Sequence, residues 1–362
     1  MHYYRIADIT LSSPLRLREY DAFVCDPCVP DVVMELTDEK PPEGTEIATE
    51  LLAYRKTENG WFFHSVVNAD TGMIVNNDYT YMRLIRGEER EVTFAERQYV
   101  RTALECQMAR RGYVSIHASC VAVDGKAVAF CGPSGMGKST RAEAWKKAFG
   151  AKLISGDRPL IHVGKKEVYG VPWDGKEKCY RNVCYPLRGI YDIRRSKKTY
   201  IRIMSFEQRR RLLLRQSFMP MWDSETAAIQ IMNITRLATD TAMYRVFGGP
   251  TPNDARELYS LLNDDQYLEE EKDMKAKSGF VLKNVVGEYI LMPVGDTISQ
   301  FKGTMLLNEV SALVWEKLQN PVSRDDLLRA IMSEYDIDEA TAAKDLDELL
   351  EKLKRYGVVE EE

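Results

Sequence analysis

The chain has 362 residues, of which 44% are hydrophobic, and a formal net charge of −5. This length favours about two or three domains, and the hydrophobic content excludes wholesale disorder. The mild charge gives no reason to expect a nucleic-acid partner, and no apolar stretch approaches the roughly 18 residues of a membrane span.

The N-terminus and the cysteines indicate the compartment. The first residues, Met1 to Arg5, lack the basic-then-apolar pattern of a secretory signal. Seven cysteines are an odd number, spread thinly through a large chain, which suits reduced thiols better than a disulfide framework. We therefore expect a cytoplasmic protein.

Residues 1–92 are predicted to form a β-rich N-terminal region. Short apolar runs alternate there with turn-forming residues, and the predicted strands include Asp21–Cys25, Asp31–Leu36, Gly60–Val67 and Gly72–Asn76. A helix is predicted next, over Thr93–Arg110. Thr93 and Glu96 have the spacing of a capping box at its start.

Residues 93–262 are predicted to form an α/β core. Val114–Val123 and Lys126–Cys131 have the pattern of two strands, and Asp124-Gly125 between them is a strong hairpin signal. A glycine-rich turn, a helix ending at Gly150 and a buried strand follow. The later strands and helices are predicted over Leu187–Ile193, Thr199–Ile203, 205–217, 223–235, Met243–Phe247 and Asn253–Leu262.

A charged linker is predicted over residues 263–278, followed by a small α+β domain over 279–362. Its predicted strands are Phe280–Lys283 and Tyr289–Pro293, with an extension of the sheet over Asp296–Phe301. Three amphipathic helices follow, over Asn308–Leu318, Ser323–Tyr335 and Asp338–Tyr356.

The strongest motif is the glycine-rich turn between the Lys126–Cys131 strand and the next helix. It fits the pattern G-x-x-x-x-G-K-[ST] of a P-loop, whose backbone amides hold phosphates. Lys138 would reach the β- and γ-phosphates, and the Ser139 hydroxyl would bind Mg²⁺. The predicted nucleotide-binding residues are Gly132, Ser134, Gly135, Met136, Gly137, Lys138, Ser139 and Thr140.

Three residues outside the loop are candidates for the chemistry. His117 precedes the P-loop strand by one hairpin and either orients a hydroxyl near the phosphates or is a satisfied core histidine. Asp157 ends the following strand, where it can bind Mg²⁺ or accept the proton of an attacking hydroxyl; the alternative is a turn cap paired with Arg158. Arg188 could clamp phosphate.

These segments together resemble the HPr serine kinase/phosphorylase family. The resemblance rests on Ser115-Ile116-His117, the Asp124-Gly125-Lys126 hairpin, the P-loop and Leu153 to Arg158, and it covers about residues 90–262. It implies a P-loop core related to phosphoenolpyruvate carboxykinase and transfer of phosphate from ATP, with Mg²⁺, to a serine hydroxyl. It also implies nucleotide contacts for Gly135 to Ser139 and an active-site role for His117.

The chain departs from this family at one catalytic position. The family's strand usually ends in two adjacent aspartates, one of which is the base, whereas this chain has Gly156 and Asp157. Asp157 would therefore serve as base, as metal ligand, or as both. Arg188-Gly189 matches only part of the family's glutamate-Ile-Arg-Gly segment, because Pro186 and Leu187 differ.

Residues from about 279 to 360 resemble the PqqD-like family. The resemblance rests on the Tyr289–Val294 strand, the helix start from Leu306 to Trp315 and the closing leucine-rich helix. It implies a small winged-helix-like fold that captures the leader peptides of ribosomally made, modified peptides by β-augmentation. A DNA-binding winged helix is the rival interpretation, and the acidic balance of this region argues against it.

The two resemblances together predict a kinase that phosphorylates a hydroxyl, most simply serine, on a captured precursor peptide. Its cofactors would be ATP and Mg²⁺, and its catalytic residues Asp157, His117 and Lys138. Other peptide-maturation enzymes are further candidate partners, and an oligomer is compatible with the sequence. Two alternatives stay open: a kinase of free serine or another small hydroxyl compound, and a non-catalytic scaffold that binds ATP and peptide.

Overall fold

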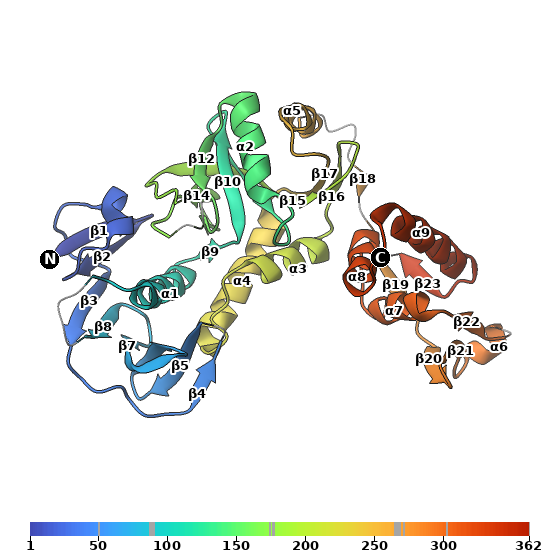
Figure 1. Cartoon of the computed structure of the whole chain (residues 1–362), viewed down its shortest axis with the longest axis horizontal. Helices are drawn as coiled ribbons and strands as arrows, with labels where there is room; N and C mark the ends of the chain where they lie inside the picture. Colours follow the sequence, from blue (N-terminus) through green and yellow to red (C-terminus); the bar gives the residue numbers. More distant parts are fainter. Residues whose placement is uncertain are drawn as a thin grey trace. The chain divides into compact units, whose positions relative to one another are not determined.

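The computed structural model describes residues 1–49, 51–86, 91–173, 175, 178–263, 269–270, 272–301 and 303–361. The chain divides into two compact units, Met1–Glu269 and Glu270–Glu362 (Figure 1). The two-residue strand β18 (Glu269–Glu270) lies at the boundary between them along the chain. No helix within the described ranges is both long enough and apolar enough to span a bilayer.

The first unit opens with a sheet on which α1 (Phe94–Arg110) packs, through Tyr99, Val100 and Leu104. The capping box predicted for this helix is confirmed, because the Glu96 amide donates to Thr93 Oγ1 at 3.2 Å and the Thr93 amide donates to Glu96 Oε2 at 2.6 Å. In spatial order the strands are β1 (His2–Ile6), β2 (Ile9–Ser13), β3 (Val32–Thr37), β8 (Tyr81–Ile85), β7 (Asn68–Asn76), β6 (Gly60–Ser65), β5 (Leu52–Thr57) and β4 (Glu46–Ala48).

The strand predicted over Asp21–Cys25 is wrong. The chain forms a 3₁₀ helix there, η1 (Arg18–Phe23), in which the Tyr20 amide donates to the Leu17 carbonyl at 2.9 Å. Tyr20 and Phe23 are both buried. Their spacing of three residues suits the three-residue turn of a 3₁₀ helix, which directs both rings to one side.

The second sheet of this unit carries the glycine-rich turn for which the sequence predicts a P-loop. Its strand β11 (Lys126–Cys131) lies between β10 (Ala118–Val123), antiparallel to it, and β15 (Cys184–Arg194), parallel to it. One end of the sheet continues from β10 to β12 (Lys152–Ser155). On the other side β15 pairs with β14 (Glu167–Tyr169) and with β17 (Met243–Phe247), and beyond them lie β13 (Leu160–His162), β9 (Tyr113–Ser115) and β16 (Tyr200–Ile203).

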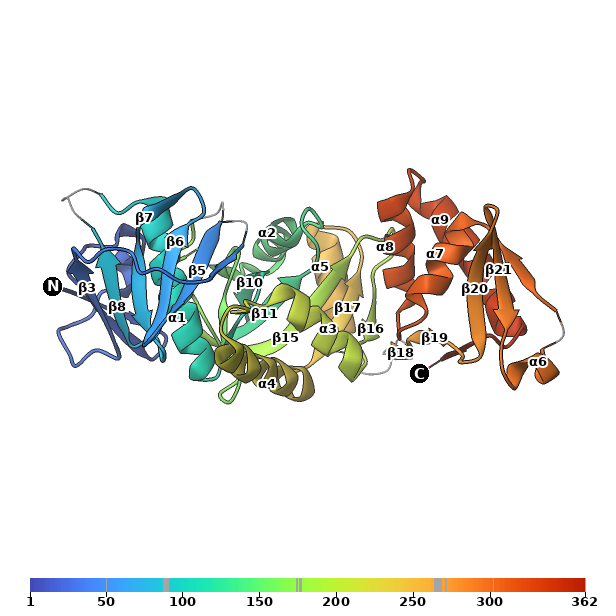
Figure 2. The same ribbon diagram turned by 90° about the horizontal axis from the view of Figure 1, so that it is seen from below.

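Helices cover both faces of this sheet (Figures 1 and 2). Alternate residues of β11 serve the two faces, as the two-residue period of a strand requires. Val128 and Phe130 pack toward α2 (Lys138–Phe149) and α5 (Pro252–Leu261). Ala127, Ala129 and Cys131 belong to the other core, which contains residues of α3 (Phe206–Gln216) and α4 (Ser224–Asp240).

The single strand predicted over Val114–Val123 is two strands in the structure. β9 ends at Ser115 and β10 begins at Ala118, because the chain changes partners between them: Ile116 N–H donates to the Pro159 carbonyl and His117 N–H to the Gln216 carbonyl, at 3.3 and 2.6 Å. His117 therefore lies in the break between β9 and β10. The alternation of side chains between the two faces of a strand does not fix the direction of its side chain there.

The second unit is a small α+β fold with its own hydrophobic core. β20 (Phe280–Val285), β21 (Glu288–Pro293) and β22 (Met305–Leu307) form an antiparallel sheet with β21 in the middle. The helices are α7 (Glu309–Lys317), α8 (Arg324–Glu334) and α9 (Glu339–Arg355), capped by Asn308, Ser323 and Asp338. β19 (Met274–Ala276) pairs with β23 (Val359–Glu361).

Two features of this unit differ from the sequence-based expectation. The sheet extension predicted over Asp296–Phe301 is wrong, since a short helix, α6 (Thr297–Gln300), forms after Gly295 reverses the chain at φ +64°. The linker predicted over 263–278 lies partly outside the described residues. Within it, Met274 and Ala276 of β19 are buried in the core of the unit.

Candidate functional site

The glycine-rich turn follows β11 directly and contains three glycines with positive φ. Gly132, Gly135 and Gly137 have φ values of +152°, +77° and +95°, a region that favours glycine. A Cβ atom on Gly132 would lie 3.1 Å from Cγ1 of Ile193, so the absence of a side chain lets the loop lie close to β15. Ser139 and Thr140 are exposed in the first turn of α2, where backbone amides lack intrahelical acceptors.

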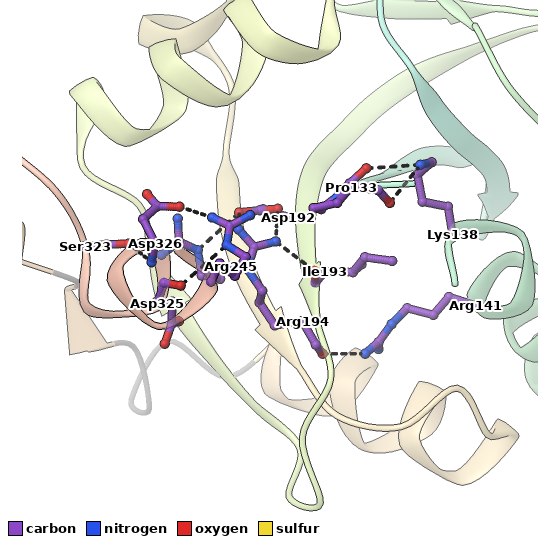
Figure 3. A network of polar contacts seen from close by, with 12 residues as sticks. Pro133, Lys138, Arg141, Asp192, Ile193, Arg194, Arg245, Ser323, Asp325 and Asp326 are labelled. Atoms are coloured by element: carbon purple, nitrogen blue, oxygen red, sulfur yellow. Dashed lines mark hydrogen bonds and ion pairs between the residues drawn. The ribbon is translucent and has the colours of Figure 1, made fainter. Parts of the chain in front are cut away.

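The Lys138 ammonium group lies against this turn. Its Nζ atom donates to the carbonyl oxygens of Gly132 at 3.0 Å and Pro133 at 3.3 Å (Figure 3). Burial lowers the pKa of Lys138, while the negative charge of Asp157 acts in the opposite direction. Within the described part of the chain, no carboxylate oxygen lies within 4.0 Å of this ammonium group. Its charge is thus directed at the loop.

The register of three strands brings His117 and Asp157 to the same edge of the sheet as the loop. Ala118 of β10 pairs with Cys131 of β11, and Cys120 pairs with Ser155 of β12. These pairings bring three segments together: His117, which precedes β10, Gly132, which follows β11, and Gly156-Asp157, which follows β12. The Ala118 amide fixes the position of Asp157, because it donates to the Asp157 carbonyl at 2.7 Å.

The side chains of His117 and Asp157 form a close pair. His117 Nε2 lies 3.4 Å from Asp157 Oδ1, and both side chains are about one-third exposed, at 38% and 30%. The pKa of His117 is lowered from its usual value, first by burial and then by the positive charge of Lys138, whereas Asp157 raises it. A neutral imidazole beside a partly exposed carboxylate is an arrangement suited to handling a proton.

A second carboxylate lies beneath the loop, and the sequence reasoning missed it. Asp192 is buried in β15, paired in register with Cys131. Arg194 Nη2 donates to it at 2.6 Å and Arg245 Nε at 3.1 Å, so its charge is balanced by two guanidinium groups (Figure 3). The signal that could have revealed it is a charged residue inside the apolar run from Gly189 to Ile193.

The structure does not bring Arg188 to the loop, which corrects its assignment as a phosphate clamp. Gly189 pairs with Val128 near the start of β11, so Arg188 lies about 15 Å along the sheet from the loop. Its guanidinium group stacks on the Tyr259 ring, 4.6 Å from the ring centroid, and its Nη2 donates to the Asn263 side chain. The sequence could not show this, because the pairing of β15 with β11 joins residues about 60 positions apart.

The donors assembled at this edge suit a magnesium–polyphosphate group. The loop amides and Lys138 provide N–H donors. Mg²⁺ commonly takes one or two protein oxygens and completes its shell with phosphates and water. Ser139 and Asp157 offer such oxygens. Among the described residues, no group of three or more His, Cys, Asp or Glu is placed to hold a metal ion.

The second unit has a groove beside the end of β22. Its volume is 1020 Å³, and it begins at Asn308, Val310 and Ser311, which directly follow that strand. Its apolar lining consists of Val310, Ile331, Ile337, Ala342, Leu346 and Leu349. Carboxylates outnumber cations around it, with Asp336, Asp345, Asp347, Glu348 and Glu351 against Lys352 and Arg355.

β22 directly precedes Asn308, which lines this groove. Met305 and Leu307 are buried, whereas Leu306 is 63% exposed. β22 pairs with β21 on one side, and no strand among the described residues pairs with its other side. A strand edge next to an apolar groove can accept an extended peptide, whose main chain bonds to the strand while its side chains enter the groove.

Comparison with known proteins bears on this second unit. Residues 288–359 match the family model described as Coenzyme PQQ synthesis protein D (PqqD). A solved structure described as TbiB1 in complex with the TbiA(beta) leader peptide is 23% identical, with a TM-score of 0.21; the match covers 24% of this chain and 94% of that one. No curated protein matches the chain. Residues 288–359 are therefore similar to PqqD, and the unit that contains them is called the PqqD-like domain below.

Proposed function

We propose that this protein is a kinase that transfers the terminal phosphoryl group of ATP to a hydroxyl, most simply serine, of a precursor peptide held by its PqqD-like domain. The observation that carries the proposal is the meeting of Lys138, His117 and Asp157 at the P-loop edge of one sheet. The PqqD-like domain in the same chain supports a peptide as the acceptor.

Each residue at the edge has a role in this proposal. The amides of Gly135 to Ser139 and the Lys138 ammonium group hold the phosphates, and Ser139 and Asp157 hold Mg²⁺. ATP supplies the electrophilic phosphorus. Asp157 accepts the proton of the attacking hydroxyl, whose oxygen forms the new P–O bond as the bond to ADP breaks. His117, neutral because of its lowered pKa, orients that hydroxyl or the Asp157 carboxylate.

The PqqD-like domain raises the concentration of the acceptor. A peptide strand added at the edge of β22 places its side chains over the groove, where carboxylates favour basic residues of the peptide. Since the peptide is then tethered to the kinase, the phosphate-transfer site can work with few acceptor contacts of its own.

A non-catalytic scaffold is the second candidate, and one observation favours it. Gly156 stands where the resembling kinase family has a further aspartate, so this edge of the sheet has one fewer carboxylate for base and metal. Such a scaffold would bind ATP and peptide without changing either. Transfer chemistry therefore separates the two candidates, whereas binding does not.

The experiment combines the full chain, ATP, Mg²⁺ and the precursor peptide encoded beside it, and measures the peptide mass. We expect a gain of one phosphate, abolished by Lys138→Ala and by Asp157→Asn. Lys146→Ala is the matched control, because Lys146 lies on the same helix but pairs with Glu143 at the surface. An unchanged peptide mass with ATP bound would support the scaffold, and phosphorylation of added free serine alone would support a small-molecule kinase.

A further inference from the structure

The turn after β15 brings a second cation to the P-loop. β15 ends at Arg194, and Ile193 lies against Gly132, so the next residue emerges beside the loop. This residue is Arg195, whose Nη2 atom donates to the Gly135 carbonyl oxygen at 2.9 Å. Lys138 contacts the first two residues of the loop, whereas Arg195 contacts its middle. Two cations therefore flank the phosphate cradle.

Arg195 differs from its neighbours in its partners. Arg194 is buried and bonded to the Asp192 carboxylate, and Arg245 shares that carboxylate. Arg195 is exposed, and no carboxylate in the described ranges lies within 4.0 Å of it. Its acceptor in the loop is a neutral carbonyl, which uses one of five N–H donors. A positive charge at a phosphate loop without a negative partner is suited to binding an anion.

The backbone that presents Arg195 is fixed to the P-loop helix. Arg141 of α2 is buried, and its Nη2 atom donates to the carbonyl oxygen of Arg194 at 2.9 Å (Figure 3). The same atom donates to the Gly248 carbonyl at 2.5 Å. Arg194 is the last residue of β15, and Gly248 directly follows the parallel strand β17. The main chain immediately before Arg195 is thus anchored to the helix that also bears Lys138, while the Arg195 side chain is exposed.

We propose that Arg195 is a phosphate-binding residue that contacts the terminal phosphate of the nucleotide; this inference rests on the proposed function. The Gly135 carbonyl is a weaker acceptor than a phosphate oxygen, because charge-assisted hydrogen bonds are roughly twice as strong as neutral ones. The terminal phosphate carries the most charge of the triphosphate and holds the charge that shifts during transfer. A planar guanidinium group can donate two parallel hydrogen bonds to it.

The test measures equilibrium binding of ATP and ADP, each with Mg²⁺, to the full chain and three variants. Arg195→Ala should weaken ATP binding about tenfold and ADP binding by less than about threefold, the cost of one charge-assisted contact. Arg195→Lys should fall between, because it keeps the charge and loses the fork. Lys198→Ala is the matched control: it removes one positive charge from the same turn and should change ATP affinity by less than about twofold.

Two results would overturn this role. ATP affinity unchanged by Arg195→Ala would show that the guanidinium group does not reach the phosphate. Equal losses for ATP and ADP, with a lower midpoint of thermal unfolding in the absence of nucleotide, would show that Arg195 only shapes the loop. If the unaltered protein binds ATP and transfers phosphate, these results remove only this inference. If it binds no ATP, the proposed function fails first and this inference fails with it.

Discussion

His117 Nε2 lies 3.4 Å from Asp157 Oδ1, although 40 positions separate the two residues in the sequence. β10 creates this contact, because Ala118 at its start pairs with the end of β11 and bonds to the backbone of Asp157. The same strand therefore positions a general base candidate, its imidazole neighbour and the start of the glycine-rich turn.

The protonation of His117 should report this arrangement. Burial and the Lys138 charge lower the pKa of His117 below its usual value, so the imidazole stays neutral until the pH falls through that lowered value. Removing the positive charge in Lys138→Met should raise the pKa, and removing the negative charge in Asp157→Asn should lower it further. NMR titration of the histidine ring measures both directions.

His162 is the internal control for this titration. Burial and the charge of Lys165 lower its pKa, and neither altered residue is among the groups that act on it. Its midpoint should stay constant in both variants. Shifts of His162 and His117 by equal amounts would instead indicate a general change of structure and contradict the local pairing.

The two glycines that cap α2 provide a matched pair. Gly137 at its start and Gly150 at its end both have positive φ, +95° and +65°. Alanine at either position should destabilise the fold by a similar amount, about 1–2 kcal/mol. Gly137→Ala should also weaken ATP binding about tenfold or more, because it turns the first-turn amides away from the phosphates. Gly150→Ala should leave ATP binding unchanged; equal ATP affinities in both variants would argue against the cradle.

Arg141 should contribute to stability. Burial lowers the pKa of its guanidinium group to about 10, and the group satisfies two backbone carbonyls. Arg141→Met keeps the stem and removes the donors, and should lower the free energy of unfolding by about 2–4 kcal/mol in urea titrations. Arg236→Met is the control, since Arg236 is exposed and pairs with Asp240 at 3.6 Å; its effect should stay within about 0.5 kcal/mol. A loss below that level for Arg141→Met would show that water replaces the guanidinium group.

Peptide capture should depend on the edge of β22. Leu306→Asp places a charge on its exposed face and should weaken binding of the leader peptide about tenfold. Val286→Asp adds the same charge in the turn between β20 and β21, where Val286 is 99% exposed, and should have little effect. Isothermal titration with the precursor peptide distinguishes the two. Equal effects of both variants would mean that the peptide binds to neither β22 nor its groove.

The sequence was sufficient where the signal is local. The Lys126–Cys131 strand and the helix ending before Gly150 occur as predicted, because alternation, glycine spacing and caps act over a few residues. The break at His117 was not predictable, since the partners that cause it, Pro159 and Gln216, are distant in the sequence.

The sequence analysis misplaced or missed the residues whose distance from the loop is set by strand register. Arg188 lies in β15, the same strand as Asp192 and Ile193, which lie near the loop. The parallel pairing with β11 nevertheless places Arg188 near the start of β11, at the end of the strand away from the loop. The same pairing puts Asp192 beneath the loop and Arg195 beside it, and neither had a motif to reveal it. Their positions follow from which strands are adjacent, which one sequence does not encode in any short pattern.

Phosphate transfer under competition tests the central claim most directly. The full chain is given ATP, Mg²⁺ and equal amounts of the precursor peptide with and without its leader, and the masses of both peptides are followed over time. The account predicts that the leader-bearing peptide gains one phosphate first, because binding to the PqqD-like domain of the same chain raises its effective concentration. It would be contradicted if both peptides kept their original masses, or if both were phosphorylated at the same rate.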